Sequence, residues 1–332
     1  MENKIPLVSV IVPNFNHERY LEERLESILA QSFRNFEVIL LDDASKDYSV
    51  DILETYSTQF ENVTLHVNKE NSGSPFKQWM KGIRQAKGEY CWIAETDDVA
   101  ASDFLATCIQ LLVKNPDCVL CYTGSTLIDE NGIRSDKDVN HWTRNERNRI
   151  IRFNGQAFAE QCLYWKNYII NASACVFKTS EAQRIAEDDW GQFRYCGDWL
   201  FWYRLARRGD VLEICRPMNL FRQHPAKATV ASNKGNGGIL EDIKIIQYIE
   251  RELPDIPRIK KRVRRGMLYG KILRNVYDET ARTAAFAAYK EKLRGTRIDY
   301  YIYKTVSILK PLFKAHAKQE RKHCKKEYIK ET

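Results

Sequence analysis

The predicted fold is organised around the stretch Ala86-Lys-Gly-Glu-Tyr-Cys-Trp-Ile-Ala-Glu-Thr-Asp97-Asp98. A turn at Lys87-Gly88 leads into a short apolar run from Tyr90 to Ala94, and two adjacent carboxylates follow. An apolar run of this length after a turn signal predicts a buried strand. In an open α/β sheet, ligands bind just beyond the carboxyl ends of the strands. Asp97 and Asp98 therefore stand where a ligand is expected, although an Asp there could also cap the helix that follows.

Two earlier segments end in polar clusters of the same kind. The β-branched run Val8–Val12 is stopped by Pro13 and followed by Asn14-Phe15-Asn16, and the run Phe36–Leu41 is followed by Asp42-Asp43. Further strands over 63–67 and 119–122 alternate with helical patterns over 20–30, 75–86 and 104–113. This alternation predicts an α/β fold with a mostly parallel sheet flanked by helices, so the polar clusters share one rim.

The sequence also limits how phosphate could be bound at this rim. Neither G-x-G-x-x-G nor G-x-x-x-x-G-K-[ST] occurs, which excludes a glycine-rich phosphate loop of the common kinds. A divalent cation held by carboxylates could replace such a loop, because Mg²⁺ is typically bound by one or two carboxylates together with substrate phosphates. We therefore expect a nucleotide-diphosphate ligand that is bound with Mg²⁺ or Mn²⁺.

Charge is distributed unevenly along the 332 residues. From residue 241 onward there are 24 Lys/Arg against 12 Asp/Glu, and residues 1–240 carry 28 against 32. A mildly acidic front and a strongly basic tail indicate that the tail meets an anionic surface. With 44% apolar residues the chain can bury a large core, and its length predicts one large domain with an appendage.

Cysteine usage and the absence of apolar spans bear on the compartment. Only Cys118 and Cys121 among the nine cysteines have CxxC spacing, and no second pair completes a zinc site. Buried free thiols in a reducing compartment are therefore expected. No signal-peptide pattern and no run of about 18 to 20 apolar residues is present, which predicts a cytoplasmic protein.

Three ordered motifs carry a resemblance to a known family. They are Val8-Ser-Val-Ile-Val-Pro-Asn-Phe-Asn-His17, Gln31-Ser-Phe-Arg-Asn-Phe-Glu-Val-Ile-Leu-Leu-Asp-Asp-Ala-Ser-Lys-Asp47 and Lys87-Gly-Glu-Tyr-Cys-Trp-Ile-Ala-Glu-Thr-Asp-Asp98. Over roughly residues 6–230 the chain resembles family 2 glycosyltransferases of the GT-A fold, which include bacterial enzymes of polysaccharide assembly. The resemblance implies a GT-A catalytic domain over residues 1–238, followed by a basic helical C-terminal region over 239–332.

The resemblance also implies a set of donor-binding and metal-binding residues. Pro13, Asn14 and Asn16 would line the nucleotide pocket, and Asp43 would accept a hydrogen bond from the ring N–H of uracil or thymine. Asp97 would lie near the ribose, and Asp98 would bind Mg²⁺ or Mn²⁺ on the diphosphate. For Asp42 and Asp47, roles in a turn and in a helix cap are expected instead.

Lys77 and His224 are candidates with open alternatives. Lys77 falls where many relatives carry an Arg near the diphosphate; it could supply the charge but not a bidentate fork, and it equally suits a solvated helix face. The segment Asn219-Leu-Phe-Arg-Gln-His224 resembles a Tyr-Arg-x-His segment whose His completes the metal or diphosphate shell, but a lone His is often structural. The glycine-containing segment 225–238 is a candidate lid over the donor.

Asp198 is the candidate general base. It stands in Tyr195-Cys-Gly-Asp-Trp-Leu-Phe-Trp-Tyr-Arg-Leu-Ala, which resembles the Glu-Asp motif of the family, with Gly197 in place of the Glu. The alternative is an N-cap at the start of an apolar helix, where hydrogen bonds from backbone N–H groups would lower the pKa and weaken the base.

The predicted function is inverting transfer of a sugar from a nucleotide-diphosphate donor, a UDP-sugar by expectation, to a glycan or lipid-linked acceptor. The alternative is a non-catalytic nucleotide-sugar-binding homologue, which Gly197 makes conceivable. The apolar and aromatic segment Tyr300–Phe313 precedes a Lys-rich end and suits an anionic membrane interface, or a helix packed back onto the catalytic domain. A nucleic-acid partner is not expected, because the tail carries no recognised motif. His141 and Trp142 either stack on a sugar or belong to an ordered loop.

Overall fold

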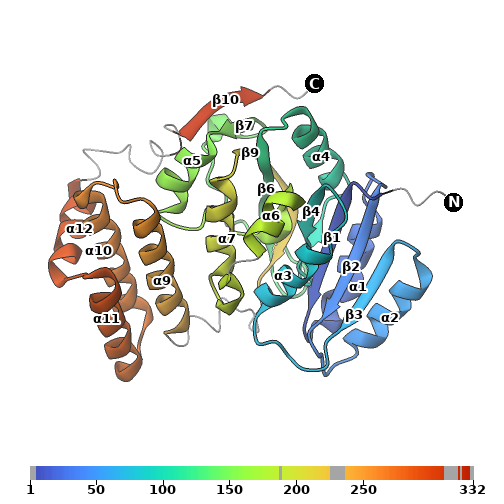
Figure 1. Cartoon of the computed structure of the whole chain (residues 1–332), viewed down its shortest axis with the longest axis horizontal. Coiled ribbons are helices and arrows are strands. Elements are labelled where there is room, and N and C mark those ends of the chain that lie inside the picture. The colour runs from blue at the N-terminus through green and yellow to red at the C-terminus, as the bar shows by residue number, and fades with distance from the viewer. Residues whose placement is uncertain (1–4, 187–188, 225–235, 310–320, 322–323, 330–332) are drawn as a thin grey trace.

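The computed structural model describes residues 5–186, 189–224, 236–309, 321 and 324–329. A mixed sheet of ten strands forms the centre of the described chain (Figure 1). The strands are β1 (Val8–Asn14), β2 (Phe36–Asp42), β3 (Val63–Val67), β4 (Tyr90–Ile93), β5 (Val99–Ala100), β6 (Cys118–Ile128), β7 (Ile150–Phe153), β8 (Cys175–Lys178), β9 (Asp210–Arg222) and β10 (Lys325–Ile329). Their order is β10-β7-β9-β6-β8-β4-β1-β2-β3, and β5 pairs with β9.

Helices cover both faces of the sheet. They are α1 (Glu18–Leu29), α2 (Ser49–Gln59), α3 (Pro75–Gln85), α4 (Phe104–Lys114), α5 (Gly155–Phe158), α6 (Thr179–Ala186), α7 (Gly197–Ala206), α9 (Gly237–Glu252), α10 (Arg258–Asn275), α11 (Glu279–Leu293) and α12 (Arg297–Leu309). Apolar residues of α1, α2 and α4 pack in one core, and those of α3, α6, α7 and α9 pack in the core of the other face. Along β1, Val10 belongs to the first core and Ile11 to the second, as the period of a strand requires.

The half of the sheet formed by β4, β1, β2 and β3 is entirely parallel, as the sequence predicts. In its register Asn14 lies opposite Asp42, and the Asp43 amide donates to the Asn14 carbonyl over 2.9 Å. Beyond β4, the Thr96 hydroxyl donates to the Pro13 carbonyl over 3.2 Å. The carboxyl ends of β1, β2 and β4 therefore meet at one rim, which confirms the predicted convergence of the polar clusters.

The rest of the sheet is mixed, because β8 pairs antiparallel with both β4 and β6, and β6 pairs parallel with β9. The strand predicted over 119–122 is part of a much longer strand, Cys118–Ile128. The predicted turn at 128–132 is present, with Gly132 at φ 83° and the Asp129 carboxylate accepting from the amides of Asn131 and Ile133.

The C-terminal helices form a bundle beside the sheet (Figure 1). α12 packs closely on α10: a Cβ atom on Gly266 would lie 2.1 Å from the Asp299 carbonyl, and the buried Asp299 pairs with Arg262 at 2.7 Å. Strand β10 then returns to pair antiparallel with β7. Residues of α9, α10 and α11 share one apolar core with the sheet. The predicted boundary between a catalytic domain over 1–238 and a helical region over 239–332 therefore stays a prediction. Among the described helices, none combines the length and the apolar run needed to cross a membrane.

All nine cysteines are free thiols, as predicted, and all but the half-buried Cys196 are buried. Burial raises the pKa of the Cys91 and Cys118 thiols to about 12, which makes them poor nucleophiles. Cys118 begins β6 and Cys121 lies within it, and both are fully buried and pack as small apolar residues.

Gly88, in the turn before β4, allows the closest approach of the chain to β1. A Cβ atom on Gly88 would lie 2.6 Å from the Ser9 amide nitrogen and 2.7 Å from the Val8 carbonyl carbon. We expect Gly88→Ala to lower the free energy of unfolding by about 3 kcal/mol, because backbone cannot move aside as a side chain can. Urea denaturation measures this. Gly270→Ala is the matched control, since its nearest neighbours are ends of side chains, and a loss as large in the control would contradict the explanation.

Candidate active site

Asp97 and Asp98 lie just beyond β4 and are almost fully buried. Asp98 Oδ1 accepts from the backbone amide of Arg222 over 3.1 Å, and Asp97 Oδ2 lies 3.1 Å from His224 Nε2. Helix α4 begins at Phe104 with Asp103 at its N-cap position, so the alternative that Asp97 and Asp98 cap this helix is wrong. Both carboxylates thus contact the end of β9 or the residues just after it: Asp98 contacts the Arg222 backbone, and His224 contacts Asp97 rather than Asp98.

Two buried arginines lie near this acidic pair. Arg222 also donates from Nε to the Asp97 carbonyl over 2.9 Å and pairs with Glu23 at 2.5 Å. Arg24 on α1 is fully buried, and its guanidinium carbon lies 4.7 Å from the centre of the Trp92 ring. Burial lowers the pKa of Arg24 to about 10, and the charges of Asp98 and Asp97 oppose this shift. Its guanidinium nitrogens have no hydrogen-bond partner within the described part of the chain.

Asp43 anchors the loop that follows β3. Its Oδ1 accepts from Asn68 Nδ2 over 2.7 Å, from the Ser72 amide over 2.9 Å and from Gln78 Nε2 over 2.7 Å. Its Oδ2 accepts from the Ser72 hydroxyl over 2.8 Å. An ionised carboxylate offers about four lone-pair sites, two on each oxygen, so Oδ2 retains capacity for another donor. Lys77, the predicted diphosphate contact, is exposed and donates to the Ser72 carbonyl over 2.8 Å.

The loop after β1 is braced against the loop after β2. Asn14 Nδ2 donates to Asp42 over 2.8 Å, and Asn16, with φ of 54°, accepts at Oδ1 from the Lys46 amide over 2.7 Å. Asp42 accepts from the Ser45 amide and hydroxyl, which is the turn role expected for it. The buried Asn14 Oδ1 has no hydrogen-bond partner among the described residues. This rim therefore presents one buried acceptor that a ligand could use.

Asp47 has the expected role at a helix end and also joins two helices. Although burial opposes the shift, hydrogen bonds from Ser49 and from the Glu18 amide hold the pKa of Asp47 below its usual value. The amide distances are 3.1 Å to Ser49 in α2 and 3.0 Å to Glu18 in α1. In return, Glu18 accepts from the Tyr48 amide over 2.6 Å. Asp47, just before α2, thus caps the starts of both helices, and Glu18 in the first turn of α1 bonds the N-cap residue of α2.

Asp198 lies in the first turn of α7, whose N-cap residue is Cys196, so Asp198 itself is not the N-cap. Burial of the carboxylate raises the pKa of Asp198 to about 7, against the opposing hydrogen bonds from Trp199 and Asn167, and the charge of Glu241 adds to the rise. The expectation of a lowered pKa is wrong, because burial outweighs the backbone hydrogen bond. A carboxylate with this pKa is a better base than an ordinary Asp near neutral pH.

The loop from Asn167 to Ser173 connects the two carboxylate sites. Asn167 Nδ2 donates to Asp198 over 2.7 Å, and the Ser173 hydroxyl accepts from the Glu95 amide, just beyond β4, over 3.1 Å. Six residues of chain span at most about 20 Å, which limits the separation of the two contacts. The loop therefore links the hydrogen-bond environment of Asp198 to the segment that follows β4.

Gly197, where the resemblance leads one to expect a Glu, is fixed by packing. A Cβ atom at this position would lie 2.5 Å from the Phe76 ring, and Phe76 packs against Trp79 and Trp190 with ring centres 5.3 and 5.9 Å away. A larger side chain would require this aromatic cluster to move. The packing of this chain therefore leaves no room for a Glu at position 197.

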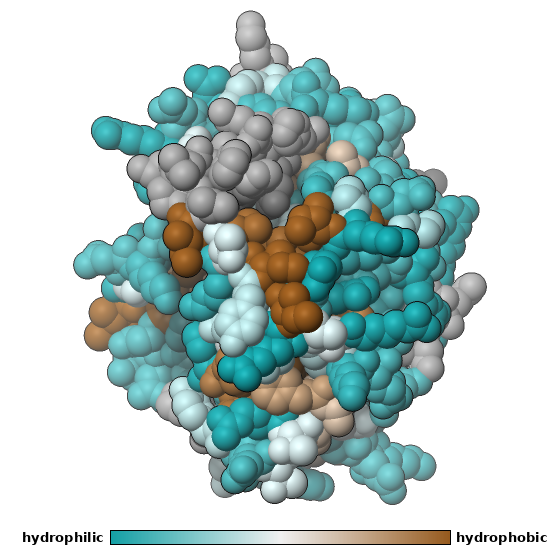
Figure 2. Space-filling model, turned by 90° about the vertical axis from the view of Figure 1, so that its left-hand side faces the viewer, coloured by the Kyte–Doolittle hydropathy of each residue, from teal (hydrophilic) through white to brown (hydrophobic). Residues whose placement is uncertain are grey.

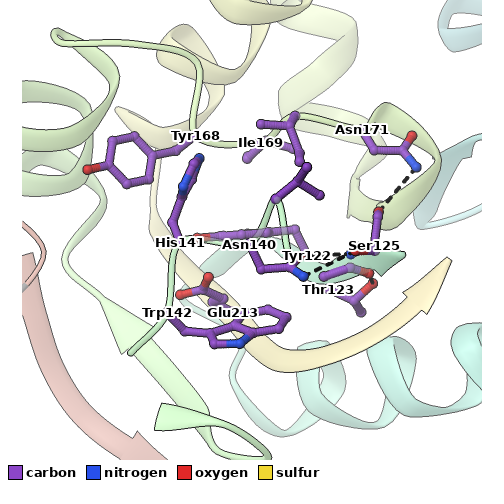
Figure 3. Close-up of a pocket in the computed structure, with 13 residues that line it drawn as sticks. Tyr122, Thr123, Ser125, Asn140, His141, Trp142, Tyr168, Ile169, Asn171 and Glu213 are labelled. Carbon is purple, nitrogen blue, oxygen red and sulfur yellow. Dashed lines mark hydrogen bonds between the residues drawn. The ribbon is translucent and has the colours of Figure 1, made fainter. Parts of the chain in front are cut away.

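His141 and Trp142 belong to an ordered loop (Figure 3). This was the alternative to stacking on a sugar. The Trp142 ring packs over Gly124, and His141 lies 4.8 Å from Tyr168 between ring centres. The cavity that they help to line has a volume of about 20 Å³, which is room for one water molecule. Burial and the nearby Lys166 lower the pKa of His141 to about 4, so it is neutral near pH 7.

The sequence of the chain matches one family. The family described as glycosyl transferase family 2 matches residues 9–175. The chain belongs to glycosyl transferase family 2. This family assignment agrees with the parallel strand ends and the acidic pair described above.

Individual relatives share part of their length with this family 2 chain. TuaG of Bacillus subtilis, a glycosyltransferase named for teichuronic acid biosynthesis, is 33% identical over 139 residues, which cover 42% of this chain and 54% of TuaG. The glycosyltransferase GlyG of Streptococcus pneumoniae is 37% identical over 115 residues, which cover 34% of this chain and 38% of GlyG. The chain thus matches about half or less of the length of these relatives.

A solved structure shares the fold over nearly the whole chain. The crystal structure of S. aureus TarS 1–349 in complex with UDP-GlcNAc superposes with a TM-score of 0.69, covering 94% of this chain and 88% of that one. At 17% sequence identity this likeness shows the fold alone. The family 2 chain therefore has the predicted GT-A fold, a mostly parallel sheet flanked by helices with helices at the C-terminal end.

Sequence reasoning missed three residues of this site. Arg24 falls within the apolar helical spacing at 21, 25 and 28, and a charge on a buried face could have been noticed there. Arg222 lies within the segment Asn219–His224, but no role was predicted for it. Asn167 carried no signal, because its contact with Asp198 depends on how the 167–173 loop is folded.

The contact between Asn167 and Asp198 gives a direct test. We expect the Asp198 side-chain ¹³C resonance to titrate with a midpoint near pH 7, and Asn167→Ala to move the midpoint higher, because a donor to the ionised form is lost. Asn131→Ala is the control, because the exposed Asn131 accepts a hydrogen bond from Arg19 and not from a residue that contacts Asp198. A midpoint near the ordinary Asp value in the unmodified protein would contradict the described environment.

Proposed function

We propose that the protein is an inverting glycosyltransferase that moves a sugar from a nucleotide-diphosphate donor to a hydroxyl group of its acceptor. The observation that carries the proposal is the pairing of two sites by one loop: a carboxylate with a pKa of about 7 at Asp198, and the acidic end of β4. A single displacement needs a base on one face of the anomeric carbon and a leaving-group site on the other, and these two carboxylate sites are proposed for the two roles. Membership of family 2 supports the same chemistry.

The donor is proposed to be a UDP-sugar. Asp43 Oδ2 would accept from the uracil N–H, and the Pro13-Asn14 end of β1, with Asn16, would line the base and ribose pocket. Asn14 Oδ1 is a buried acceptor without a partner among the described residues, and buried polar atoms of this kind call for a ligand or water. Asp97 would lie near the ribose and Lys77 near the diphosphate. That TarS was crystallised with UDP-GlcNAc supports this donor class.

Asp98 and His224 are proposed to hold Mg²⁺ or Mn²⁺. No cluster of three or more His, Cys, Asp or Glu side chains that could hold a metal is found in the described residues, but one or two carboxylates suffice when substrate phosphates complete the shell. The oxygen-rich end of β4 fits such an ion. When bound, it would neutralise charge that develops on the diphosphate leaving group.

Asp198 is proposed to act as the general base. Its carboxylate would take the proton from the acceptor hydroxyl as that oxygen attacks the anomeric carbon from the face opposite the diphosphate. The bond to the diphosphate breaks as the new glycosidic bond forms, so the anomeric configuration is inverted. Asn167 orients the carboxylate through its hydrogen bond of 2.7 Å.

The acceptor is proposed to be a glycan or a lipid-linked sugar of cell-surface polysaccharide synthesis, in keeping with the name of TuaG. A lipid-linked acceptor would be met at the inner face of the plasma membrane, by a cytoplasmic enzyme held peripherally through its C-terminal helices. Residues 258–309, which include α10, α11 and α12, carry 14 Lys/Arg against 4 Asp/Glu. This charge is complementary to an anionic lipid surface.

The outward side of α12 supports the same partner. Ile298, Tyr301 and Ile308 are 60%, 52% and 74% exposed, and their spacing places them on one side of the helix. The exposed Arg297 and Lys304 flank this apolar side. Figure 2, which faces these helices, shows apolar side chains in a band among hydrophilic ones. Apolar and cationic groups on one exposed helix face are typical of helices that lie in a membrane interface.

The membrane proposal predicts charge-dependent and α12-dependent binding to vesicles. The full-length chain should sediment with phosphatidylglycerol-containing vesicles, and Lys304→Gln should weaken partitioning about fivefold, since one cation near an anionic surface contributes about 1 kcal/mol. Tyr301→Ser should weaken it as well, while the control Tyr48→Ser, at an exposed Tyr of the catalytic domain, should not. Equal binding to neutral vesicles, or no effect of the α12 variants, would overturn this proposal.

The catalytic proposal is tested with a panel of nucleotide sugars, read as released nucleotide diphosphate in the presence of Mg²⁺ or Mn²⁺. We expect turnover with a UDP-sugar, a fall of about tenfold per pH unit below pH 7, and a loss of about 10²- to 10⁴-fold in Asp198→Asn. The fall follows because protonated Asp198 cannot accept the proton. UDP binding should persist in Asp198→Asn, and the exposed control Asp136→Asn should behave as the unmodified protein.

The alternative is a non-catalytic nucleotide-sugar-binding protein, which Gly197 favours because it removes one carboxylate beside Asp198. In that case the unmodified protein binds UDP but releases no nucleotide diphosphate from any donor. Failure of every uridine and thymidine donor to bind, even with metal, would contradict the roles proposed for Asp43 and Asp98.

A further inference from the structure

The start of α7, which carries Asp198, is held by a carboxylate from a distant helix. Glu241, in the second turn of α9, accepts from the Arg194 amide at Oε1 over 2.7 Å. Its Oε2 accepts from the amides of Tyr195 and Cys196, both over 2.8 Å. Glu241 is 8% exposed, so these bonds are shielded from water. Hydrogen bonds with one ionised partner are roughly twice as strong as neutral ones.

This contact gives an acceptor to one of the N–H groups at the start of α7, that of the N-cap residue Cys196. The first N–H groups of a helix have no partner within the helix, and the side chain of Cys196 at the N-cap position makes no capping hydrogen bond. Gly197 has no side chain, and the Phe76 ring leaves no room for one. The acid that binds the amides before α7 therefore comes from elsewhere, and a negative charge at a helix N-terminus is stabilising.

The first residues of α9 fit closely against this segment at other points. The Cys196 thiol lies 3.7 Å from the Gly238 carbonyl and 3.6 Å from Asp242 Oδ1. A Cβ atom on Gly237 would lie 2.5 Å from the Tyr195 ring. Because three amide hydrogen bonds and three further close contacts hold residues 194–196 on α9, we infer that α9 sets the direction in which α7 begins.

We propose that Glu241 is a positioning residue for Asp198: it fixes the backbone that leads into α7 and places its negative charge beside the base. The proposal rests on the proposed function, since it gives Glu241 a role in the reaction through Asp198. With this role for Glu241, α9 is part of the catalytic unit. The C-terminal helices are then needed for catalysis as well as for any contact with a membrane.

The charges around Asp198 determine what removal of Glu241 would do. Besides Glu241, α9 contributes Asp242, whose charge is met by Lys271 of α10 at 2.6 Å. From α10, the Arg264 guanidinium carbon lies 5.5 Å from the centre of the Trp199 ring. Glu241 accepts from backbone amides and forms no ion pair with the other described residues, so its charge opposes ionisation of Asp198 most directly.

The test compares Glu241→Gln and Glu241→Ala with the control Glu252→Gln. Glu252 lies on α9 as well, and it pairs with Arg207 just after the C-terminal end of α7 at 2.8 Å. The control therefore makes the same Glu-to-Gln change on α9, at a contact far from residues 194–196. A Gln offers one acceptor oxygen, so it cannot accept all three amides. We expect faster amide hydrogen exchange at residues 194–196 in both Glu241 variants, and no change in the control.

In the nucleotide-release assay, kcat should fall by roughly 10- to 100-fold in Glu241→Gln, because a small displacement of the base is costly, while KM for the donor stays unchanged. The acid limb of the pH profile should move to lower pH by roughly 0.5 to 1 unit, because a charge that opposes ionisation is lost. A merely structural role would lower the melting temperature and speed exchange without moving the pH limb, and that result overturns the proposal.

Two further outcomes are decisive. Unchanged exchange at 194–196 in Glu241→Ala would overturn the proposal, because the three amides would not depend on this carboxylate. If the unmodified protein transfers no sugar, the proposed function fails, but the ¹³C titration of Asp198 still tests Glu241: a midpoint unmoved by Glu241→Gln would overturn the inference.

Discussion

The parallel pairing of β1 with both β2 and β4 is the constraint on which the rest of the structure depends. It brings three carboxyl ends of strands together, so that side chains 28 and 83 residues apart in sequence, Asn14 with Asp42 and Thr96 with the Pro13 carbonyl, become hydrogen-bond partners. Ligands of open α/β sheets bind at such rims because the loops there are free to vary while the strands stay fixed. In this chain the rim concentrates negative charge, and the buried Arg24 of α1 lies close enough for the charges of Asp98 and Asp97 to oppose the loss of its proton.

The parallel half of the fold could be predicted from the sequence because its signals are local. The strand over 63–67 is present at the predicted residues, and the predicted helices over 75–86 and 104–113 are present to within one residue. The acidic pair could be placed at a strand end for the same reason. Long-range pairing left no such signal: β10 joins β7 across more than 170 residues, and a run rich in lysine does not by itself predict a sheet edge.

The character of Asp198 shows why site residues are harder to predict than strands. From sequence, its position near a helix start indicated a lowered pKa, because only the neighbouring amides could be foreseen. The structure adds burial beneath the 167–173 loop and the charge of Glu241, and these outweigh the amides. Burial and approach of another helix depend on tertiary packing, whereas capping depends on the local chain. The same distinction explains why the roles of Asp42 and Asp47 were predicted correctly and that of Asn167 was not.

Asp43 shows how one carboxylate can serve both folding and binding. Three of its four hydrogen bonds fall on Oδ1, from Asn68, Ser72 and Gln78, and these close the loop between β3 and α3. Oδ2 takes only the Ser72 hydroxyl, which can rotate, so a further donor can be added without breaking the loop. A carboxylate fixed on one side and open on the other is already oriented before a ligand arrives. The conformational entropy of this side chain is then lost on folding rather than on binding. That preorganisation favours tight recognition of a single N–H group.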